Sequence, residues 1–590
     1  MNRILSSQLL SHENNRVLLR GWLVSFRSLG KLNFLILRDR TGFAQVIVED
    51  KEDAKKLAGL FPGSVLSVEG KPVKSEQAGL GVEVLEPKIE VEVAVSEPPP
   101  IEYYKPEIPS DLEFILDHRS IALRNQKIQA VFNVQAEMVH AFRLYMHDVV
   151  EAKEYFAPNI LGASSEGGAE FFNVDYFGYT ATLAQSSQLY KQIMVGVNER
   201  VFALMPFFRA EPSHTPRHLS EGKQFEFEMG FFDHWHDVLD VQEGCIKAIT
   251  DHVQTHCKQE LETLGSNWIQ CPKDVSIPRV TFEEAQELYF KRTGVDERNE
   301  PDLSPSAERE LCKYAKEEHG TDLIFITDWK KEKRPFYSFV NEKNPELTNT
   351  FDLLCNGVEI TSGGQRCHTY EDMVAGIESK GMDPENFQDY LTVFKYGMPP
   401  HGGFGMGLER LTMTMLGLKN IREASLFPSD PKRIAGNRIK ANIVFGGENI
   451  RNEIIRLLNQ HDMEFEHIVD GEESSEGGIK ALILKGKKTK KNYQFNLPVH
   501  LKMDMKAIAA AVGEKCEFED PAVIKERFGL IIGGVPPFGN LLNLETYFDE
   551  KVLEHPNVVF NCGLSQEQIA MKSEDLLKLV DAKTGNFSKE

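Results

Sequence analysis

The chain has 590 residues, a formal net charge of −22 at pH 7 and 41% hydrophobic residues, so it is too long for one core and is expected to form roughly three or four domains. The acidic balance argues against a protein whose whole surface binds nucleic acid, although a local basic patch is compatible with it because an exposed charge acts over only about 10 Å. No apolar run approaches the roughly 20 residues of a membrane helix, the N-terminus has no signal-peptide pattern, and the eight cysteines include no CxxC pair, which predicts a soluble cytoplasmic protein without zinc, disulfides or membrane partners.

Residues 16–90 contain five short runs rich in β-branched and aromatic residues, separated by turn signals such as Arg40-Thr41-Gly42 and Pro62-Gly63. Five strands in so short a segment predict a small barrel of the OB-fold type, within an N-terminal domain at 1–100. The proline-rich segment SEPPPIEYYKPEIP (96–109) cannot continue a sheet, so we expect a hinge over 101–127.

A second domain is expected at 128–432. Residues 127–148 repeat apolar positions at helical spacing, and helical patterns at 282–294, 306–318 and 385–396 alternate with strand-like runs. The short basic segment DPKRIAGNRIK (430–440) predicts a linker at 433–447. An amphipathic helix and a compact mixed α/β pattern then predict a further domain at 448–583, so the whole chain is expected to be an α+β multidomain protein.

The run PFFRAEPSHTPRHLSEGKQFEFEMGFF (206–232) predicts two antiparallel strands. Because alternate residues of a strand share a face, Arg209 and Glu211 are expected on one side. In the returning strand Glu226 and Glu228 are expected opposite an apolar face formed by Phe225, Phe227, Met229 and Phe231. Such a surface can hold a phosphate and an ammonium group together, since arginine offers a bidentate fork. An amphipathic hairpin with ordinary surface ion pairs would give the same pattern.

The run TFDLLCNGVEITSGGQRCH (350–368) contains Asn356-Gly357, a strong signal for a two-residue hairpin. If Cys355 pairs with Val358, Asp352 lies opposite Thr361 with Glu359 as its diagonal neighbour. Two carboxylates so placed can share a hard cation such as Mg²⁺. An exposed acidic hairpin without a metal is the alternative.

The run YGMPPHGGFGMGLERLTMTMLGL (396–418) has closely spaced glycines that would let the backbone approach a ligand. A helix is expected to begin at its GLER segment, with Arg410 in the first turn, where anions are already favoured. Taken alone, this pattern is also that of an ordinary helix start.

Together these runs resemble the signature motifs of class II aminoacyl-tRNA synthetases. FRAE…RH resembles motif 2, GLER resembles motif 3, and Pro158 in EAKEYFAPNI resembles the proline of motif 1. The segments AQSSQLYKQIM (184–194), HTPRH, SGGQR and YGMPPHGGFGMGLER are similar to the archaeal-type aspartyl-tRNA synthetases. The resemblance covers about residues 15–432 and implies an OB-fold anticodon-binding domain followed by the antiparallel-sheet catalytic domain of class II.

The resemblance implies that ATP and Mg²⁺ are used to form an aspartyl-adenylate, whose aspartate is then transferred to tRNA-Asp. Arg209 would bind the α-phosphate and Arg410 the γ-phosphate, both as catalytic residues. The ATP-binding set it implies is Arg209, Glu211, Arg217, His218, Glu359 and Arg410. Asp352 and Glu359 would hold the metal. The amino-acid-binding set it implies is Glu170, Gln188, Lys191, Glu226 and Arg366, with SSEGGAE (164–170) as a closing loop.

Two departures from the family pattern affect the substrates. Family members usually have Glu-Phe where this chain has Glu221-Gly222, so the ring that stacks on adenine is missing or comes from elsewhere. Aspartyl enzymes usually carry aspartate at the position of Glu226, and glutamate there resembles the asparaginyl enzymes. Lys191 favours aspartate, because a cation suits a carboxylate better than an amide.

A third departure concerns tRNA choice. Archaeal-type enzymes that accept only tRNA-Asp tend to have Trp and Lys at the positions of Val24 and Gly79. We therefore hypothesise that tRNA-Asn is also charged with aspartate.

The C-terminal domain has two informative features, Lys480 within the apolar run GGIKALIL and the stiff Gly-Pro loop IIGGVPPFGNLL (531–542). Each alone is more typical of a structural role. With FEDP and YFDEKVLEHPNVVFNCG (547–563), they resemble the YbaK/prolyl-tRNA-editing deacylases. The resemblance implies hydrolysis of a mischarged tRNA without a metal, with an editing site formed by Lys480, Gly534, Val535, Pro536, Pro537 and Gly539. The lysine-rich KGKKTKK (485–491) would bind tRNA phosphates or form a solvated turn.

Two alternatives stay open for the whole chain. One is an asparagine–tRNA ligase or another altered specificity. The other is a degenerate paralogue that binds tRNA or an adenylate without charging, which Gly222 and Glu226 would favour. The resemblance also implies a homodimer formed through motif 1, and we expect no DNA partner.

Overall fold

The structure is a computed structural model that describes residues 2–29, 32–76, 78, 81–162, 171–177, 179–211, 214–266, 268–438, 446–461, 463–469, 477–580 and 582–589. It divides into two compact units, Met1–Arg438 and Ile439–Glu590. Among the described residues, no helix combines the length and the apolar character that crossing a membrane requires.

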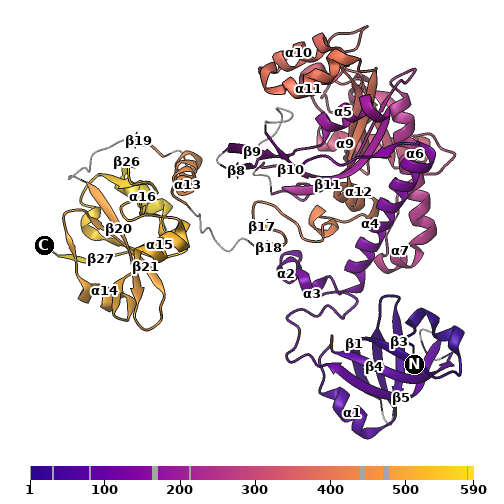
Figure 1. Ribbon diagram of the computed structural model, residues 1–590, viewed down its shortest axis with the longest axis horizontal. Helices are drawn as coiled ribbons and strands as arrows, with labels where there is room; N and C mark the ends of the chain where they lie inside the picture. Colours follow the sequence, from indigo (N-terminus) through magenta and orange to yellow (C-terminus); the bar gives the residue numbers. More distant parts are fainter. Residues whose placement is uncertain are drawn as a thin grey trace. The chain divides into compact units, whose positions relative to one another are not determined.

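The N-terminal part is the expected five-stranded OB-type barrel, closed in the order β1-β2-β3-β5-β4 (Figure 1). Alternate side chains fill its interior, where Leu35, Val46 and Val68 have no exposed surface. Helix α1 (Lys51–Ala58) begins where the Asp50 carboxylate accepts hydrogen bonds from two backbone N–H groups. The strands are β1 (Val17–Leu29), β2 (Leu32–Arg38), β3 (Phe43–Val48), β4 (Val65–Lys74) and β5 (Val82–Val93).

The segment predicted as a hinge contains two short helices, α2 (Leu112–Asp117) and α3 (Arg119–Ala122). Arg119 donates to the carbonyl oxygens of Ser425 and Leu426 at 2.6 and 2.9 Å. The prediction of a plain hinge over 101–127 missed these helices because its proline-rich signal ends at Pro109. Within the predicted linker 433–447, β17 (Arg433–Ile434) and β18 (Asn437–Arg438) form a small hairpin.

The catalytic-type sheet has eight strands in the order β12-β13-β14-β15-β16-β11-β10-β6. The six central strands, from β13 to β10, are antiparallel, as expected for class II. Its strands are β6 (Lys153–Glu154), β10 (Arg200–Phe208), β11 (Glu221–Gly230), β12 (Arg279–Thr281), β13 (Leu323–Thr327), β14 (Thr350–Cys355), β15 (Val358–Arg366) and β16 (His401–Gly407). A smaller sheet is formed by β7 (Ile160–Leu161), β8 (Asn173–Tyr176) and β9 (Tyr179–Leu183).

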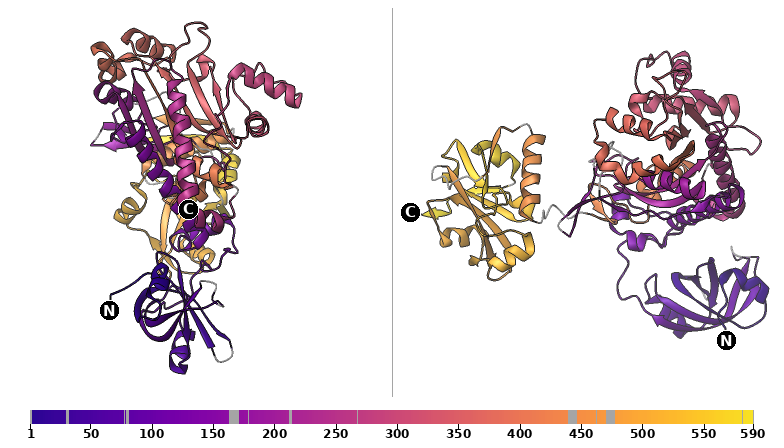
Figure 2. Two further views of the ribbon diagram at one scale, coloured as in Figure 1. Left: turned by 90° about the vertical axis from the view of Figure 1, so that its right-hand side faces the viewer. Right: turned by 45° about the horizontal axis from the view of Figure 1, so that its top comes forward.

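Helices surround this sheet, and the long helices α4 and α6 lie side by side across one of its faces (Figures 1 and 2). The helices are α4 (Gln126–Leu144), α5 (Gln188–Asn198), α6 (Asp237–His256), α7 (Lys258–Leu264), α8 (Phe282–Thr293), α9 (Pro305–His319), α10 (Tyr370–Ser379), α11 (Gln388–Thr392) and α12 (Leu408–Leu416). The predicted helices at 127–148, 282–294 and 306–318 are confirmed by α4, α8 and α9. The predicted helix at 385–396 is only the short α11 with a 3₁₀ turn on either side.

The core lies between the apolar face of this sheet and the covering helices. Phe225, Phe227 and Met229 point into it as the strand alternation predicts. Phe231 does not, because it follows the end of β11 with a φ of 57° and is 69% exposed. On the opposite face, Glu226 and Glu228 of β11 project beside a second apolar cluster, to which β10 contributes Val201, Ala203 and Met205.

The C-terminal unit is built on a second mixed sheet, ordered β19-β26-β25-β20-β21-β24-β27, with β23 beside β20. The amphipathic helix predicted at its start is α13, whose Ile450, Ile454 and Leu458 are fully buried. The strands are β19 (Phe465–Val469), β20 (Gly478–Gly486), β21 (Asn492–Pro498), β22 (Lys502–Met503), β23 (Cys516–Phe518), β24 (Glu545–Asp549), β25 (Asn557–Asn561), β26 (Glu567–Lys572), β27 (Ala582–Gly585) and β28 (Ser588–Lys589). The helices are α13 (Gly447–Gln460), α14 (Met505–Val512), α15 (Pro521–Phe528) and α16 (Ser573–Leu579).

Candidate functional site

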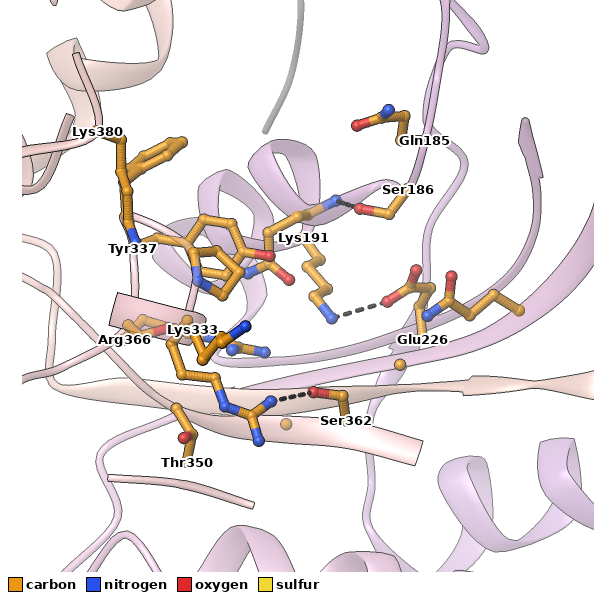
Figure 3. A pocket seen from close by; sticks show the side chains of 18 of the residues that line it. Gln185, Ser186, Lys191, Glu226, Lys333, Tyr337, Thr350, Ser362, Arg366 and Lys380 are labelled. Atoms are coloured by element: carbon orange, nitrogen blue, oxygen red, sulfur yellow. Dashed lines mark hydrogen bonds and ion pairs between the residues drawn. The ribbon is translucent and has the colours of Figure 1, made fainter. Parts of the chain in front are cut away.

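A cavity of about 500 Å³ opens on the polar face of the catalytic-type sheet. Strands β11, β14, β15 and β16, helix α5, Arg209 and Glu211 after β10, and residues 332–338 line it, and Figure 3 shows side chains converging on the space. The described lining includes six cations and three carboxylates, so an anionic ligand is favoured there. The cations are Lys191, Arg209, Lys333, Arg334, Arg366 and Lys380.

Two buried cations pair with two buried carboxylates at the base of this cavity. Lys191 Nζ lies 2.7 Å from Glu226 Oε2 and 3.4 Å from Glu228 Oε2. Arg366 Nε donates to Glu228 Oε1 at 2.9 Å. Burial alone would raise the pKa of Glu228, but Arg366 and Lys191 hold that pKa below its ordinary value. We call Lys191, Arg366, Glu226 and Glu228 the charged quartet.

Helix α5 brings Lys191 to the sheet together with a polar network that the sequence analysis did not identify. Gln188, Lys191 and Gln192 are buried on the same side of the helix, as their three- and four-residue spacing requires. Gln188 Nε2 donates to Gln192 Oε1 at 3.0 Å, and Gln192 Nε2 lies 2.9 Å from His401 Nε2. Burial lowers the pKa of His401 to about 4, so its ring is neutral and can accept this bond. The network fixes the orientation of Gln188 toward the cavity.

Two glycines of β16 leave room for this constellation. A Cβ atom on Gly403 would lie 2.3 Å from Glu228 Oε2, and one on Gly405 would lie 2.1 Å from Gln224 Nε2. Strand β16 therefore runs close beside the site because these positions have no side chain. The close approach seen here is to the side chains of Glu228 and Gln224, and the predicted approach of this backbone to a ligand stays a prediction.

The predicted hairpin of Asp352 and Glu359 is present, but its register differs from the expectation. Cys355 pairs with Val358, yet a β-bulge in β15 places Asp352 opposite Ser362 instead of Thr361. The extra residue of the bulge was not visible in the simple alternation of the sequence. Burial and the neighbouring Asp352 carboxylate raise the pKa of Glu359 to about 7. Two carboxylates this close suit a divalent cation, which would relieve their repulsion.

Arginines hold both carboxylates of this pair in place. Arg334 binds Asp352 in a bidentate manner, at 3.0 and 2.7 Å, and its Nη1 also donates to Ser362 Oγ. Arg410 lies 3.6 Å from the Glu359 carboxylate and donates to its backbone oxygen. Arg334 was not predicted, although its place in the lysine-rich segment 330–334 marks it as a candidate anion ligand.

A smaller recess of about 120 Å³ adjoins the cavity and shares Arg209, Gln224, Ser362 and Gly405 with it. Its walls bring together the predicted phosphate ligands Arg209, Arg217, His218 and Arg410 with the predicted metal ligand Glu359. Burial and the charge of Arg410 lower the pKa of His218. Glu211 lines the main cavity, whereas Glu170 and the whole SSEGGAE segment fall outside the described residues. Gly79, one of the two positions expected to affect tRNA choice, is likewise outside them.

In the C-terminal unit, Lys480 lies on β20, and its ammonium group donates to the backbone oxygens of Val499, at 2.9 Å, and Leu501. Burial lowers its pKa. The Gly-Pro loop contacts the adjacent strand, since Gln494 of β21 donates to Pro536 O at 2.6 Å. Gly534, Val535, Pro536, Pro537 and Gly539 are all buried, whereas residues 531–533 at the start of the loop are exposed.

The lysine-rich segment 485–491 covers the last two residues of β20 and the turn that leads to β21. Lys485, Lys487 and Lys491 make ion pairs with Glu519, Glu517 and Glu545. This arrangement favours the solvated turn over a site for tRNA phosphates.

The sequence matches three protein families in chain order. These are the OB-fold nucleic acid binding domain over residues 17–97, the tRNA synthetases class II (D, K and N) over 111–431, and the aminoacyl-tRNA editing domain over 470–579. The chain is 43% identical to the aspartate–tRNA(Asp/Asn) ligase of Thermus thermophilus, over 73% of this chain and 99% of the relative. It is 38% identical to the aspartate–tRNA(Asp) ligase of Pyrococcus furiosus, over 71% of this chain and 96% of the relative.

Solved structures agree with this match. The asparaginyl-tRNA synthetase of Pyrococcus horikoshii in complex with asparaginyl-adenylate superimposes with a TM-score of 0.67 at 31% identity, over 74% of this chain and 99% of that one. The antiparallel sheet, the arginine-rich recess and these matches together identify the family. The chain belongs to the class II tRNA synthetases of the D, K and N group, and it carries an N-terminal OB-fold domain and a C-terminal aminoacyl-tRNA editing domain.

Proposed function

We propose that this chain is an aspartate–tRNA ligase that activates aspartate with ATP and transfers it to tRNA-Asp. The observation that carries the proposal is the pair of buried cations, Lys191 and Arg366, in a cavity with a cationic lining. A second carboxylate on the substrate suits this site better than an amide does, because burial strengthens charge–charge attraction. The relatives named as aspartate–tRNA ligases support the same substrate.

In the proposed complex, Lys191 and Arg366 hold the side-chain carboxylate of aspartate. Gln188, fixed by Gln192, orients the amino acid, while Glu226 and Glu170 balance its ammonium group. Both cations already bond to carboxylates of the charged quartet, so the bound substrate would share them with Glu226 and Glu228. Because these charged side chains are already buried and oriented in the absence of substrate, they need to reorganise little when aspartate binds.

In the proposed reaction, the α-carboxylate of aspartate attacks the α-phosphorus of ATP in line, and pyrophosphate leaves. Arg209 would bind the α-phosphate, and Arg217, His218 and Arg410 would bind the outer phosphates, with Glu211 beside the nucleotide. Asp352 and Glu359 would hold Mg²⁺, and the bound ion would neutralise part of the phosphate charge. The site works by positioning and charge stabilisation, so no side-chain nucleophile is needed. A terminal hydroxyl of the tRNA then attacks the adenylate carbonyl, and AMP leaves.

A second candidate is activation of asparagine. Glu226 lies 2.7 Å from Lys191 and partly neutralises the positive charge of that lysine. An asparaginyl-tRNA synthetase also has a similar structure. The third candidate is a paralogue that binds without charging.

ATP–pyrophosphate exchange, measured separately with aspartate, asparagine and glutamate, distinguishes these candidates. We expect exchange with aspartate, and we expect Lys191→Met to reduce it at least about 100-fold because the substrate carboxylate would lose a buried partner. Lys273→Met is the matched control, since Lys273 is exposed and forms an ion pair with Asp251 at 2.8 Å. Exchange with asparagine alone would replace the proposal by the second candidate, and no exchange with any amino acid would support the third.

Charging of purified tRNA-Asp and tRNA-Asn with labelled aspartate tests the breadth of tRNA use. We propose that both are charged, because Val24 and Gly79 stand where strict enzymes tend to have larger residues. Comparable aspartylation of both tRNAs is the expected outcome. Strict preference for tRNA-Asp would show that other contacts discriminate the anticodon.

We propose that the C-terminal domain hydrolyses a mischarged aminoacyl-tRNA. Two of the three donors of the Lys480 ammonium bond to backbone oxygens, which leaves one directed hydrogen for the 3′ end of the tRNA. Gly534 and the loop from Val535 through Pro536 and Pro537 to Gly539 would line the aminoacyl pocket. Water would attack the ester without a metal.

Deacylation of a panel of mischarged tRNAs tests this role. Lys480→Ala is expected to abolish deacylation of the accepted substrate and to leave aspartylation unchanged. The matched control is Lys578→Ala, which removes an exposed lysine paired with Asp575 in the same unit. Equal deacylation by the Lys480→Ala variant and the parent protein would rule out this lysine.

We also propose that the chain forms a homodimer in the cytoplasm. Large apolar side chains are exposed at and after the end of α4, where Leu144, Val149 and Phe156 are 41%, 65% and 85% exposed. Sedimentation equilibrium is expected to give twice the chain mass of 66.8 kDa, and Phe156→Arg is expected to weaken the association. A monomer at micromolar concentration would contradict the proposal.

A further inference from the structure

Phe207 is an aromatic residue on the polar face of the sheet, beside the arginine-rich recess. It pairs with Gly222 across β10 and β11, and the same alternation puts Met205, Gln224 and Glu226 on that face. Its neighbour Phe208 pairs with Glu221 and points to the opposite side of the strand. Phe207 lies at the end of β10 nearest the recess, where its cross-strand neighbours on this face are Gly222 and the polar Gln224, so its ring is available to a ligand there.

Gly222 and Phe207 occupy one space between them. A Cβ atom built on Gly222 would lie 2.6 Å from Cζ and 2.7 Å from Cε1 of Phe207. The phenyl ring therefore lies where a side chain at position 222 would begin. The two strands can present an aromatic ring here from position 207 or from position 222, but not from both at once.

The ring also forms part of the wall of the recess of about 120 Å³, together with Arg209, Arg217 and Arg410. The guanidinium group of Arg209 lies 5.2 Å from the ring centroid. Three arginines beside one aromatic wall suit a ligand with several negative charges and a flat π system. A nucleoside triphosphate has both properties.

We propose that Phe207 supplies the stacking surface for the base of ATP and takes over the position of the ring that is absent at Gly222. This inference rests on the proposed ATP-dependent activity. In this chain the aromatic ring comes from Phe207 of β10 instead of from position 222 of β11, and the missing side chain of Gly222 leaves space for it. Phe207 acts as a nucleotide-binding residue and has no part in amino-acid selection.

Two measurements test this assignment: calorimetric titration with ATP in the absence of amino acid, and KM values for ATP and aspartate in pyrophosphate exchange. Phe207→Leu is expected to weaken ATP binding and raise the KM for ATP roughly 5- to 150-fold, the range that corresponds to loss of one base–aromatic stack. The KM for aspartate is expected to change less than about twofold. Phe208→Leu is the matched control, with the same substitution on the other face of the same strand, and it should leave ATP binding unchanged.

A double variant separates stacking from simple space filling. Gly222→Phe alone would clash with Phe207, whereas Phe207→Val combined with Gly222→Phe returns a ring to the recess from β11. The double variant is expected to recover ATP affinity to within about threefold of the parent protein. Phe207→Tyr keeps the ring and should bind ATP normally, which provides a folded comparison if Phe207→Leu is unstable.

Unchanged ATP affinity in Phe207→Leu would overturn the proposal. An equal rise in the KM values for ATP and aspartate would also overturn it. So would a double variant that binds ATP no more tightly than Phe207→Leu does. Because the calorimetric titration needs no amino-acid activation, it stays decisive even if the parent protein shows no exchange. In that case the proposed ligase activity would be rejected, while the effect of Phe207→Leu on ATP affinity would still test the nucleotide site.

Discussion

The catalytic half of this protein depends on the burial of two cations and two carboxylates on one face of an antiparallel sheet. Lys191 is 1% exposed and Glu228 is fully buried, and taking each such ion out of water costs several kcal/mol before pairing. The charges are tolerated because each cation contacts a carboxylate and a backbone oxygen, as Lys191 does with Phe404 O and Arg366 with Gly403 O. The sheet and the core beneath it hold these groups in place before any substrate arrives.

Several other features follow from this constraint. Strand β16 must have glycine at 403 and 405, since a side chain there would overlap Glu228 or Gln224. Helix α5 must direct Lys191 inward, and its neighbour Gln192 is satisfied by the neutral ring of His401. Arg334 and Arg410 extend the cationic lining toward Asp352 and Glu359. The result is a continuous polar surface that suits an anionic amino acid at one end and a polyphosphate at the other.

Much of this arrangement could be predicted from the sequence because local periodicity determines it. Alternation in 221–230 predicted which side chains leave the core, and helical spacing predicted α4, α8 and α9. The bulge in β15 could not be predicted, because one inserted residue leaves the apolar pattern nearly unchanged. The Gln192–His401 contact joins residues 209 positions apart, and the role of Phe207 depends on the cross-strand register with Gly222. Such long-range pairings have no signal in a short window of sequence.

The most direct test of the charged quartet is calorimetric titration of the full chain with aspartate and with asparagine, each without ATP. The two ligands have almost the same shape and differ mainly in charge. The ratio of their dissociation constants therefore measures how strongly the charged quartet prefers a side-chain carboxylate over an amide. Aspartate is expected to bind at least about tenfold more tightly, which corresponds to roughly 1.4 kcal/mol. Equal binding, or tighter binding of asparagine, would show that Glu226 and Glu228 neutralise the site and that the assignment to aspartate is wrong.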